Sequence, residues 1–378
     1  MPLFTCRLML TGAICAPILA PAMALAHTDL TIFNQSAFNG HPVVINCTLE
    51  DGTNTECYEF TVDYMPKGLK IGPFCPATVN DKGGIWNWTG ENGKLYRVDG
   101  DFLRMLDGLG YRFFDDDGTV HTVDNATQRP AVDHACINVS VDESVKITMR
   151  LPVTPVMAIT PTKLGVVGKV GVALDGVPIF SDAPSIQQTG HMPALDTCGG
   201  HVDPGGWYHW HATATDIDTV FATEHVDAGC ALAQNSGGQF GYAFDGFPMF
   251  GSTEPDGTAP TELDACYGHV GETALGRTYH YHASTDFPNL PPCLVGVQAQ
   301  GNFTTTAAAG IGAKRAGQAG GLPPGFDEAA KKLGITIEEL SQALGTPQGG
   351  PPDLAAAAAK LGKTEAELKA ILPAPPGQ

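Results

Sequence analysis

The sequence contains an internal duplication, so any fold of this chain must accommodate two copies of one unit. Three blocks recur in the same order along the chain. Residues 171–180 recur as 241–250, residues 195–201 as 263–269, and residues 208–212 as 279–283, at offsets of 70, 68 and 71 residues. A repeat kept over three blocks indicates two similar structural units. We expect them to pack about a pseudo-two-fold axis, either as one continuous β core or as two small ones.

The first block of each copy has the sequence of a β-hairpin. Asp175-Gly176 and Asp245-Gly246 stand between apolar arms, and Asp-Gly is a strong signal for a tight hairpin turn. A proline, Pro178 or Pro248, follows each turn two residues later. Because proline has no N–H to donate to a sheet, the returning arm is predicted to be an edge strand or to bend away.

Composition and patterning favour β structure in much of the remaining chain. Of the 378 residues only 16% are charged, while 46 are glycine and 29 are proline, which is typical of short strands joined by many turns. Residues 144–151 alternate, with Val145, Ile147, Met149 and Leu151 on one face. Weaker strand candidates lie at 43–45 and 58–62. The sequence therefore predicts a mainly β protein: a disulfide-stapled β-sandwich-like core with an internal duplication, plus a small α-helical C-terminal tail.

The first 26 residues have the three parts of a secretory signal peptide. They are Arg7, an apolar stretch over residues 8–19, and the small-residue ending Ala24-Leu25-Ala26. No later segment is long and apolar enough to span a membrane. We therefore expect a soluble protein that is secreted or periplasmic, with no membrane span.

Cleavage after Ala26 would leave eight of the ten cysteines, and eight cysteines in an oxidising compartment predict a disulfide framework. The duplication suggests two pairs, closure of a hairpin suggests a third, and the fourth is what remains. The favoured pairs are Cys198 with Cys230, Cys266 with Cys293, Cys47 with Cys57, and Cys75 with Cys136. Thiolate metal ligation is the less favoured alternative, because no Cys-x-x-Cys occurs.

The chain divides by composition and repeats into five parts. They are a signal peptide (1–26), an N-terminal β region (27–160), a duplicated domain (161–302, with units 161–232 and 233–302), a flexible linker (303–325) and a tail of two helical hairpin repeats (326–378). In each tail repeat a helix is predicted to end at a glycine, Gly334 or Gly362. The following Thr-x-x-Glu, at 336–339 and 364–367, is a capping box that opens the next helix. Docking to a protein partner and surface decoration are both open roles for this tail.

The charge balance restricts the partners of the chain. It has 40 acidic and 21 basic residues and a net charge of -19. Such a chain repels phosphate backbones and anionic lipid, so we expect no nucleic acid and no membrane surface as partner. Cations are the better candidates for binding partners of this acidic chain.

Histidines are concentrated in the duplicated domain, where eight of the twelve fall within residues 191–282. Each unit has a His-x-His, and a strand would place both rings on one face, about 6 to 7 Å apart at Cα. Each unit adds a third histidine behind a glycine. The predicted metal ligands are His201, His209, His211, His269, His280 and His282. Imidazole without free thiolate suits copper(II) or zinc(II), so the implied cofactor is copper or zinc, for sequestration, delivery or redox use.

Other interpretations of these histidines stay open. The Tyr-His-aromatic-His motif can be a packing motif, anchored by Asp196 and Asp264, in a structural or protein-interaction module. Alternatively, the sites can serve a metal-dependent oxidoreductase or hydrolase, which needs an open coordination position. No known catalytic motif occurs, so no catalytic residue is assigned. The sequence also leaves open whether the histidines form one shared site or two.

A run of motifs in the second unit resembles a known family. It comprises Asp245-Gly246-Phe247-Pro248, Leu263-Asp264-Ala265-Cys266-Tyr267-Gly268-His269, Tyr279-His280-Tyr281-His282, and Pro292-Cys293-Leu294-Val295-Gly296. These motifs resemble the YHYH family of exported proteins. The first unit has the altered form Tyr208-His209-Trp210-His211, which keeps both histidines. A segment at 72–76 also looks like part of such proteins, so the resemblance extends over about 43–302. The resemblance implies an architecture and the location of a site, but it does not indicate which reaction, if any, the protein catalyses.

Overall fold

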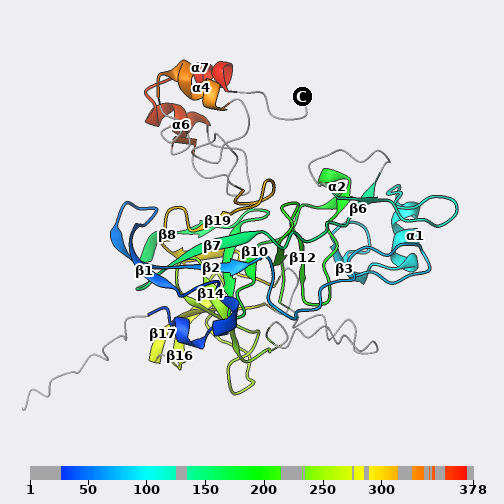
Figure 1. Cartoon of the computed structure of the whole chain (residues 1–378), viewed down its shortest axis with the longest axis horizontal. Coiled ribbons are helices and arrows are strands. Elements are labelled where there is room, and N and C mark those ends of the chain that lie inside the picture. Colours follow the sequence, from blue (N-terminus) through cyan, green and yellow to red (C-terminus); the bar gives the residue numbers. More distant parts are fainter. Residues whose placement is uncertain are drawn as a thin grey trace, which may run out of the picture.

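The computed structural model describes residues 27–124, 134–213, 232, 235–274, 276–284, 289–313, 326–335, 340, 343–344 and 354–372. Within these residues the chain is mainly β, as predicted, with small helices near the C-terminus (Figure 1). The predicted signal peptide lies outside them.

An eight-stranded sheet carries both copies of the repeat, in the order β12-β13-β10-β9-β14-β15-β17-β16. The first unit supplies β9 (Lys169–Ala173), β10 (Pro178–Phe180), β12 (Gly200–Val202) and β13 (Tyr208–Trp210), and the second supplies β14 (Gln239–Ala243), β15 (Pro248–Phe250), β16 (Gly268–Thr273) and β17 (Gly276–His282). The strands of one unit stand in the mirrored order of the other. The sheet therefore has a pseudo-two-fold axis at its centre, and the duplication forms one continuous sheet.

The axis passes between β9 and β14, which pair antiparallel with Val172 opposite Tyr242. Two glycines of the repeat, Gly171 and Gly241, stand at this seam. A Cβ atom on either would overlap a backbone oxygen of the facing strand, that of Tyr242 or of Val172. Glycine is therefore the residue that permits the two units to approach this closely.

Each Asp-Gly turn joins two antiparallel strands, as predicted. Of the two alternatives for the arms that begin at Pro178 and Pro248, the edge strand was wrong, because β10 lies between β9 and β13, and β15 lies between β14 and β17. Both arms do have a register shift against the preceding strand. Each proline is the first residue of its strand. Parallel pairing with the outer neighbour begins one residue later, at Ile179 and Met249. The missing N–H therefore falls where the parallel neighbour needs no donor.

A four-stranded sheet packs against the long sheet. It consists of β1 (Val43–Thr48), β2 (Asn54–Asp63), β7 (Lys146–Pro152) and β19 (Phe303–Thr305), in the order β1-β2-β7-β19. The predicted alternation of residues 144–151 is confirmed, since Val145, Ile147, Met149 and Leu151 are at most 1% exposed. Their side chains share one apolar core with those of the long sheet, which is a sandwich-like arrangement (Figure 1).

The start of the predicted linker belongs to this sheet. Residues 303–305, assigned to the linker from composition, form β19 and pair with β7. Phe303 is 6% exposed and contacts Phe180, Trp207 and Phe244. A short Phe-Thr-Thr run carries too little pattern to reveal a strand before its partner is known.

A smaller cluster adjoins the first unit. Its elements are β3 (Ile85–Trp88), β4 (Lys94–Arg97), α1 (Gly100–Gly108), β5 (Thr122–Val123), β6 (Ala135–Ile137), α2 (Ile186–Thr189) and β11 (His191–Met192). The N-cap of helix α1 is Asp99, whose side chain accepts from the N–H groups of Asp101 and Phe102. The apolar core of this cluster draws on both 86–136 and 183–194. The N-terminal region therefore contains a helix that strand-like patterning did not predict, and it shares a core with the first unit.

The remaining elements outside the tail are short. They are the 3-10 helices η1 (Leu30–Ile32) and η2 (Gln35–Ala37) and the antiparallel pair β8 (Met157–Lys163) and β18 (Cys293–Gly296).

Three of the predicted disulfides are confirmed: Cys47–Cys57, Cys75–Cys136 and Cys266–Cys293. Cys198 is disulfide-bonded as well, and its predicted partner, Cys230, lies outside the described residues. Disulfides are typical of chains that fold in an oxidising compartment. In the part of the chain that the structure describes, no helix has the length and apolar character that crossing a membrane requires.

The described tail consists of α4 (Phe326–Leu333), α6 (Leu354–Lys360) and α7 (Glu365–Ile371). Gly334 and Gly362 have φ values of 72° and 65° just after α4 and α6, as the predicted helix ends require. The capping box of Thr364 and Glu367 is present, and its predicted counterpart at 336–339 lies outside the described residues. The helices form a small apolar core of their own, which includes Ala329, Ala330, Leu340, Ala357, Ala358 and Leu368.

Candidate metal centre

Strand register brings three histidines of each unit together. In the first unit His201 on β12 lies opposite His209 on β13, and in the second His269 on β16 lies opposite His280 on β17. The last histidine of each His-x-His follows two residues later and lies on the same face. The resulting groups are the first triad (His201, His209 and His211) and the second triad (His269, His280 and His282).

The Nε2 atoms of each triad converge. The three Nε2–Nε2 distances are 2.9, 3.1 and 3.1 Å in the first triad and 3.0, 3.1 and 3.2 Å in the second. Three nitrogens bound tetrahedrally to one ion at about 2.0 to 2.1 Å would lie about 3.3 Å apart. Both triads are therefore close to the spacing that a shared ion needs.

The six predicted residues form two separate groups. The strand pairs β12-β13 and β16-β17 lie at opposite ends of the eight-stranded sheet, so the histidines do not gather across the pseudo-two-fold axis. Among the described residues no other histidine joins either group. His225 lies outside the described residues, and the assignment of the six as metal ligands stays a prediction.

Burial keeps five of the six rings neutral, those of His201, His209, His211, His280 and His282. His209, His211, His280 and His282 are at most 2% exposed. Burial lowers the pKa of His211 and of His280 to about 4, and it also lowers the pKa of His201, His209 and His282. Since a neutral imidazole is the form that binds a metal, these five rings are in the ligating state at pH 7.

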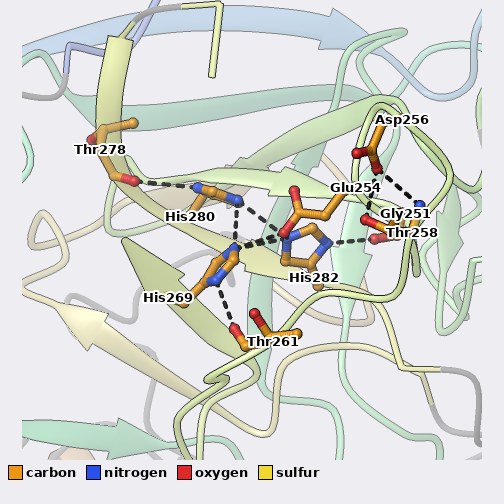
Figure 2. A network of polar contacts seen from close by, with 9 residues as sticks. All are labelled: Gly251, Glu254, Asp256, Thr258, Thr261, His269, Thr278, His280 and His282. Carbon is orange, nitrogen blue, oxygen red and sulfur yellow. Dashed lines mark hydrogen bonds and ion pairs between the residues drawn. The ribbon is translucent and has the colours of Figure 1, made fainter. Parts of the chain in front are cut away.

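Backbone carbonyls fix the tautomer of every ring in the second triad (Figure 2). The Nδ1 partners are the carbonyl oxygens of Thr261 for His269, Thr278 for His280 and Gly251 for His282, at 2.9, 3.2 and 2.9 Å. A carbonyl oxygen only accepts, so each Nδ1 carries the hydrogen and each neutral ring presents an Nε2 lone pair. Three lone pairs aimed at one another repel unless a cation lies between them.

The first triad uses the same device at an equivalent position. Nδ1 of His211 contacts the carbonyl oxygen of Ser181, which directly follows the first-unit block, as Gly251 follows the second-unit block. The Nε2 atom of His211 therefore also presents a lone pair to its neighbours.

One residue at the second triad, Glu254, was not predicted from the sequence. Its Oε1 lies 3.2 Å from Nε2 of His269 and 3.7 Å from Nε2 of His282, and Figure 2 shows the carboxylate beside the three rings. Glu254 lies in the loop after β15, outside the repeated blocks, so the repeat did not point to it. A residue-by-residue comparison of the two copies would have drawn attention to Glu254, because its counterpart in the first unit, at the offset of 70 residues, is Pro184.

The tyrosines before each His-x-His fix the loops that carry the third histidine. Tyr208 donates to both carboxylate oxygens of Asp196 at 2.9 and 3.0 Å, and Tyr279 donates to Asp264 at 2.9 Å. Each aspartate also accepts from a half-cystine N–H and from the N–H of the glycine before the histidine, at Cys198 and Gly200 or at Cys266 and Gly268. The Tyr–Asp pair thus positions the third histidine without touching the triad.

Asp196→Ala is expected to lower the free energy of unfolding by about 3 kcal/mol or more, and Asp264→Ala by about 1 kcal/mol. Asp196 is fully buried, and its loss leaves the hydroxyl of Tyr208 and the N–H groups of Cys198, Gly200 and Gly72 without their acceptor. Asp264 is exposed, so water replaces its carboxylate. Urea denaturation of the two variants measures the difference, and equal midpoints would contradict this account of the anchors.

Comparison with known proteins identifies part of the chain. A family model described as YHYH protein matches residues 148–262, whereas the comparisons with curated proteins and with solved structures found no match. The matched segment runs from β7 to the loop before β16 and contains the first triad and Glu254. Of the second-unit motifs that carry the resemblance, Asp245-Gly246-Phe247-Pro248 lies within the match, and the motifs at 263–269, 279–282 and 292–296 lie beyond its end. Residues 148–262 therefore match the YHYH protein family, as the resemblance predicted.

Proposed function

We propose that this protein is an exported metal-binding protein that holds copper or zinc at two sites, one on each triad, for sequestration, delivery or redox use. The observation that carries the proposal is the tautomer of the second triad. All three Nδ1 atoms donate to carbonyl oxygens, so three Nε2 lone pairs face one another at 3.0 to 3.2 Å. A cation at their centre turns this repulsion into coordination.

The packing interpretation accounts less well for this geometry. Rings that only pack would direct each Nε2 to a donor, because a buried acceptor without one costs about 1 to 3 kcal/mol. The described polar neighbours of the second triad's Nε2 atoms are the other Nε2 atoms and the Glu254 carboxylate, none of which has a hydrogen to donate. A shared proton is a weaker occupant, because burial disfavours the charged ring.

The donor set suggests which ions fit. Imidazole nitrogens, joined in the second triad by a carboxylate oxygen, suit copper(II) and zinc(II) better than calcium or magnesium, which prefer sites of oxygen ligands. The predicted signal peptide and the confirmed disulfides support a site of action outside the cytoplasm, in the periplasm or the medium.

Metal analysis of the mature protein tests the proposal. Stripped protein, loaded with excess Cu(II) or Zn(II) and then desalted, is expected to retain two equivalents by inductively coupled plasma mass spectrometry. The double variants His209→Ala/His211→Ala and His280→Ala/His282→Ala are each expected to retain one. His41, which is exposed and outside both triads, supplies the control His41→Ala, which should retain two.

The same measurement can also refute the proposal. A folded wild-type protein that retains well under one equivalent of either ion would remove the proposal. It would leave the structural or interaction module as the account of the motifs.

A further inference from the structure

The two triads differ in charge, and the difference comes from one loop. The second triad has Glu254 within 3.2 Å of a ligand nitrogen. Among the described residues no carboxylate joins the first triad. The side chains of Glu254 and His269 are 24% and 13% exposed, whereas the first triad is buried throughout. One fold thus holds a neutral, closed site and an anionic, more accessible one.

The loop holds Glu254 in place. The chain turns back after β15 through two backbone bonds, from the Glu254 N–H to Thr258 at 2.8 Å and from the Gly257 N–H to Glu254 at 2.9 Å. The Asp256 side chain accepts from the Thr258 N–H at 2.9 Å and closes the same turn (Figure 2). A carboxylate on a fixed turn is preorganised toward the rings, so little ordering is needed when an ion binds.

We propose, as an extension that rests on the proposed metal-binding function, that Glu254 is the fourth ligand of the second site and sets its ion preference. The second site then selects a divalent cation, Zn(II) or Cu(II), over Cu(I). Attraction between an ion and a carboxylate scales with the charge of the ion, so the carboxylate favours a dication over a monocation. The first site, with three neutral imidazoles as its described ligands, leaves a buried dication uncompensated and discriminates less against Cu(I).

Isolating the second site makes this testable. In the His209→Ala/His211→Ala background, dissociation constants are measured by competition with chromophoric chelators, for Zn(II) in air and for Cu(I) without oxygen. Glu254→Gln keeps the shape and removes the charge. We expect it to raise the Kd for Zn(II) by about 10- to 100-fold and the Kd for Cu(I) by less than about threefold.

Glu272→Gln is the matched control. Glu272 lies on β16, the strand that carries His269. Its side chain is exposed, and its ion pair with Arg277 is long, at 3.9 Å. Because solvent screens such a charge, this variant should keep both Kd values within about twofold.

The outcomes separate the two proposals. Equal changes for the two ions, or no change, would overturn the role of Glu254 and leave metal binding intact. A lower Kd for Zn(II) in Glu254→Gln would also overturn it, because the carboxylate would then hinder binding of the ion. A folded background protein that binds neither ion would instead refute the proposed function at this site.

Discussion

Gly171→Ala is expected to lower the free energy of unfolding by at least about 3 kcal/mol, at the upper end of the usual cost of overpacking. Its Cβ would overlap the backbone oxygen of Tyr242 and press on Ala243 and Met249. These atoms belong to the other unit's β14 and β15, and backbone in the middle of a sheet cannot move aside as a flexible side chain can. The change therefore separates the two halves of the sheet, and urea denaturation measures the loss.

Gly108→Ala is the control for this experiment. Gly108 ends α1, is exposed, and has no atom within 4 Å of a built Cβ. Alanine is the better helix former, so the free energy of unfolding should stay unchanged or rise by up to about 1 kcal/mol. Equal urea midpoints for the two variants would contradict a close seam between β9 and β14.

Saturation of both triads with metal is expected to raise the free energy of unfolding by about 5 kcal/mol. An ion that binds only the folded chain contributes about 2.7 kcal/mol per site when its free concentration is 100 times the Kd. The stabilisation is specific to the folded state because strand register assembles the triads. Urea denaturation with zinc and with a chelator, at a fixed pH, measures the difference.

The two double variants divide this gain. With His280→Ala/His282→Ala, zinc should still contribute about half of the wild-type stabilisation, through the first triad. With all four of His209, His211, His280 and His282 replaced, it should contribute nothing. An undiminished gain in that variant would mean that zinc binds elsewhere, for instance on the acidic surface, and would contradict assignment of the stabilisation to the triads.

Sequence reasoning succeeded where a local pattern fixes the geometry. The alternation of 144–151 predicts which side chains of β7 are buried, and the Asp-Gly turns predict both hairpins. The duplication led to Cys266–Cys293, which the structure contains. It also drew attention to the six histidines, whose rings the structure brings together in threes. These features depend on residues close in sequence or on the comparison of two copies.

Sequence reasoning failed where the neighbours of a segment decide its role. Pro178 and Pro248 suggested edge strands, but the outer strands β13 and β17 add to β10 and β15 beyond the prolines. Residues 303–305 look like linker by composition and become β19 because β7 offers an unpaired edge. Helix α1 depends on a core to which residues 183–194 contribute from a later part of the chain. None of these partners is adjacent in sequence.

The residues of the candidate site also fall into those that the local sequence places and those that only the tertiary structure places. The chain by itself determined that His209 with His211, and His280 with His282, lie on one face of a strand, because successive side chains of an extended backbone alternate. Only the tertiary structure decided that His201 and His269 complete two triads, through the pairing of β12 with β13 and β16 with β17. Only the turn after β15 brings Glu254 to the second triad. The physical reason is that backbone geometry acts over two residues, whereas the register of strands and the path of a loop depend on hydrogen bonds and packing across the whole sheet.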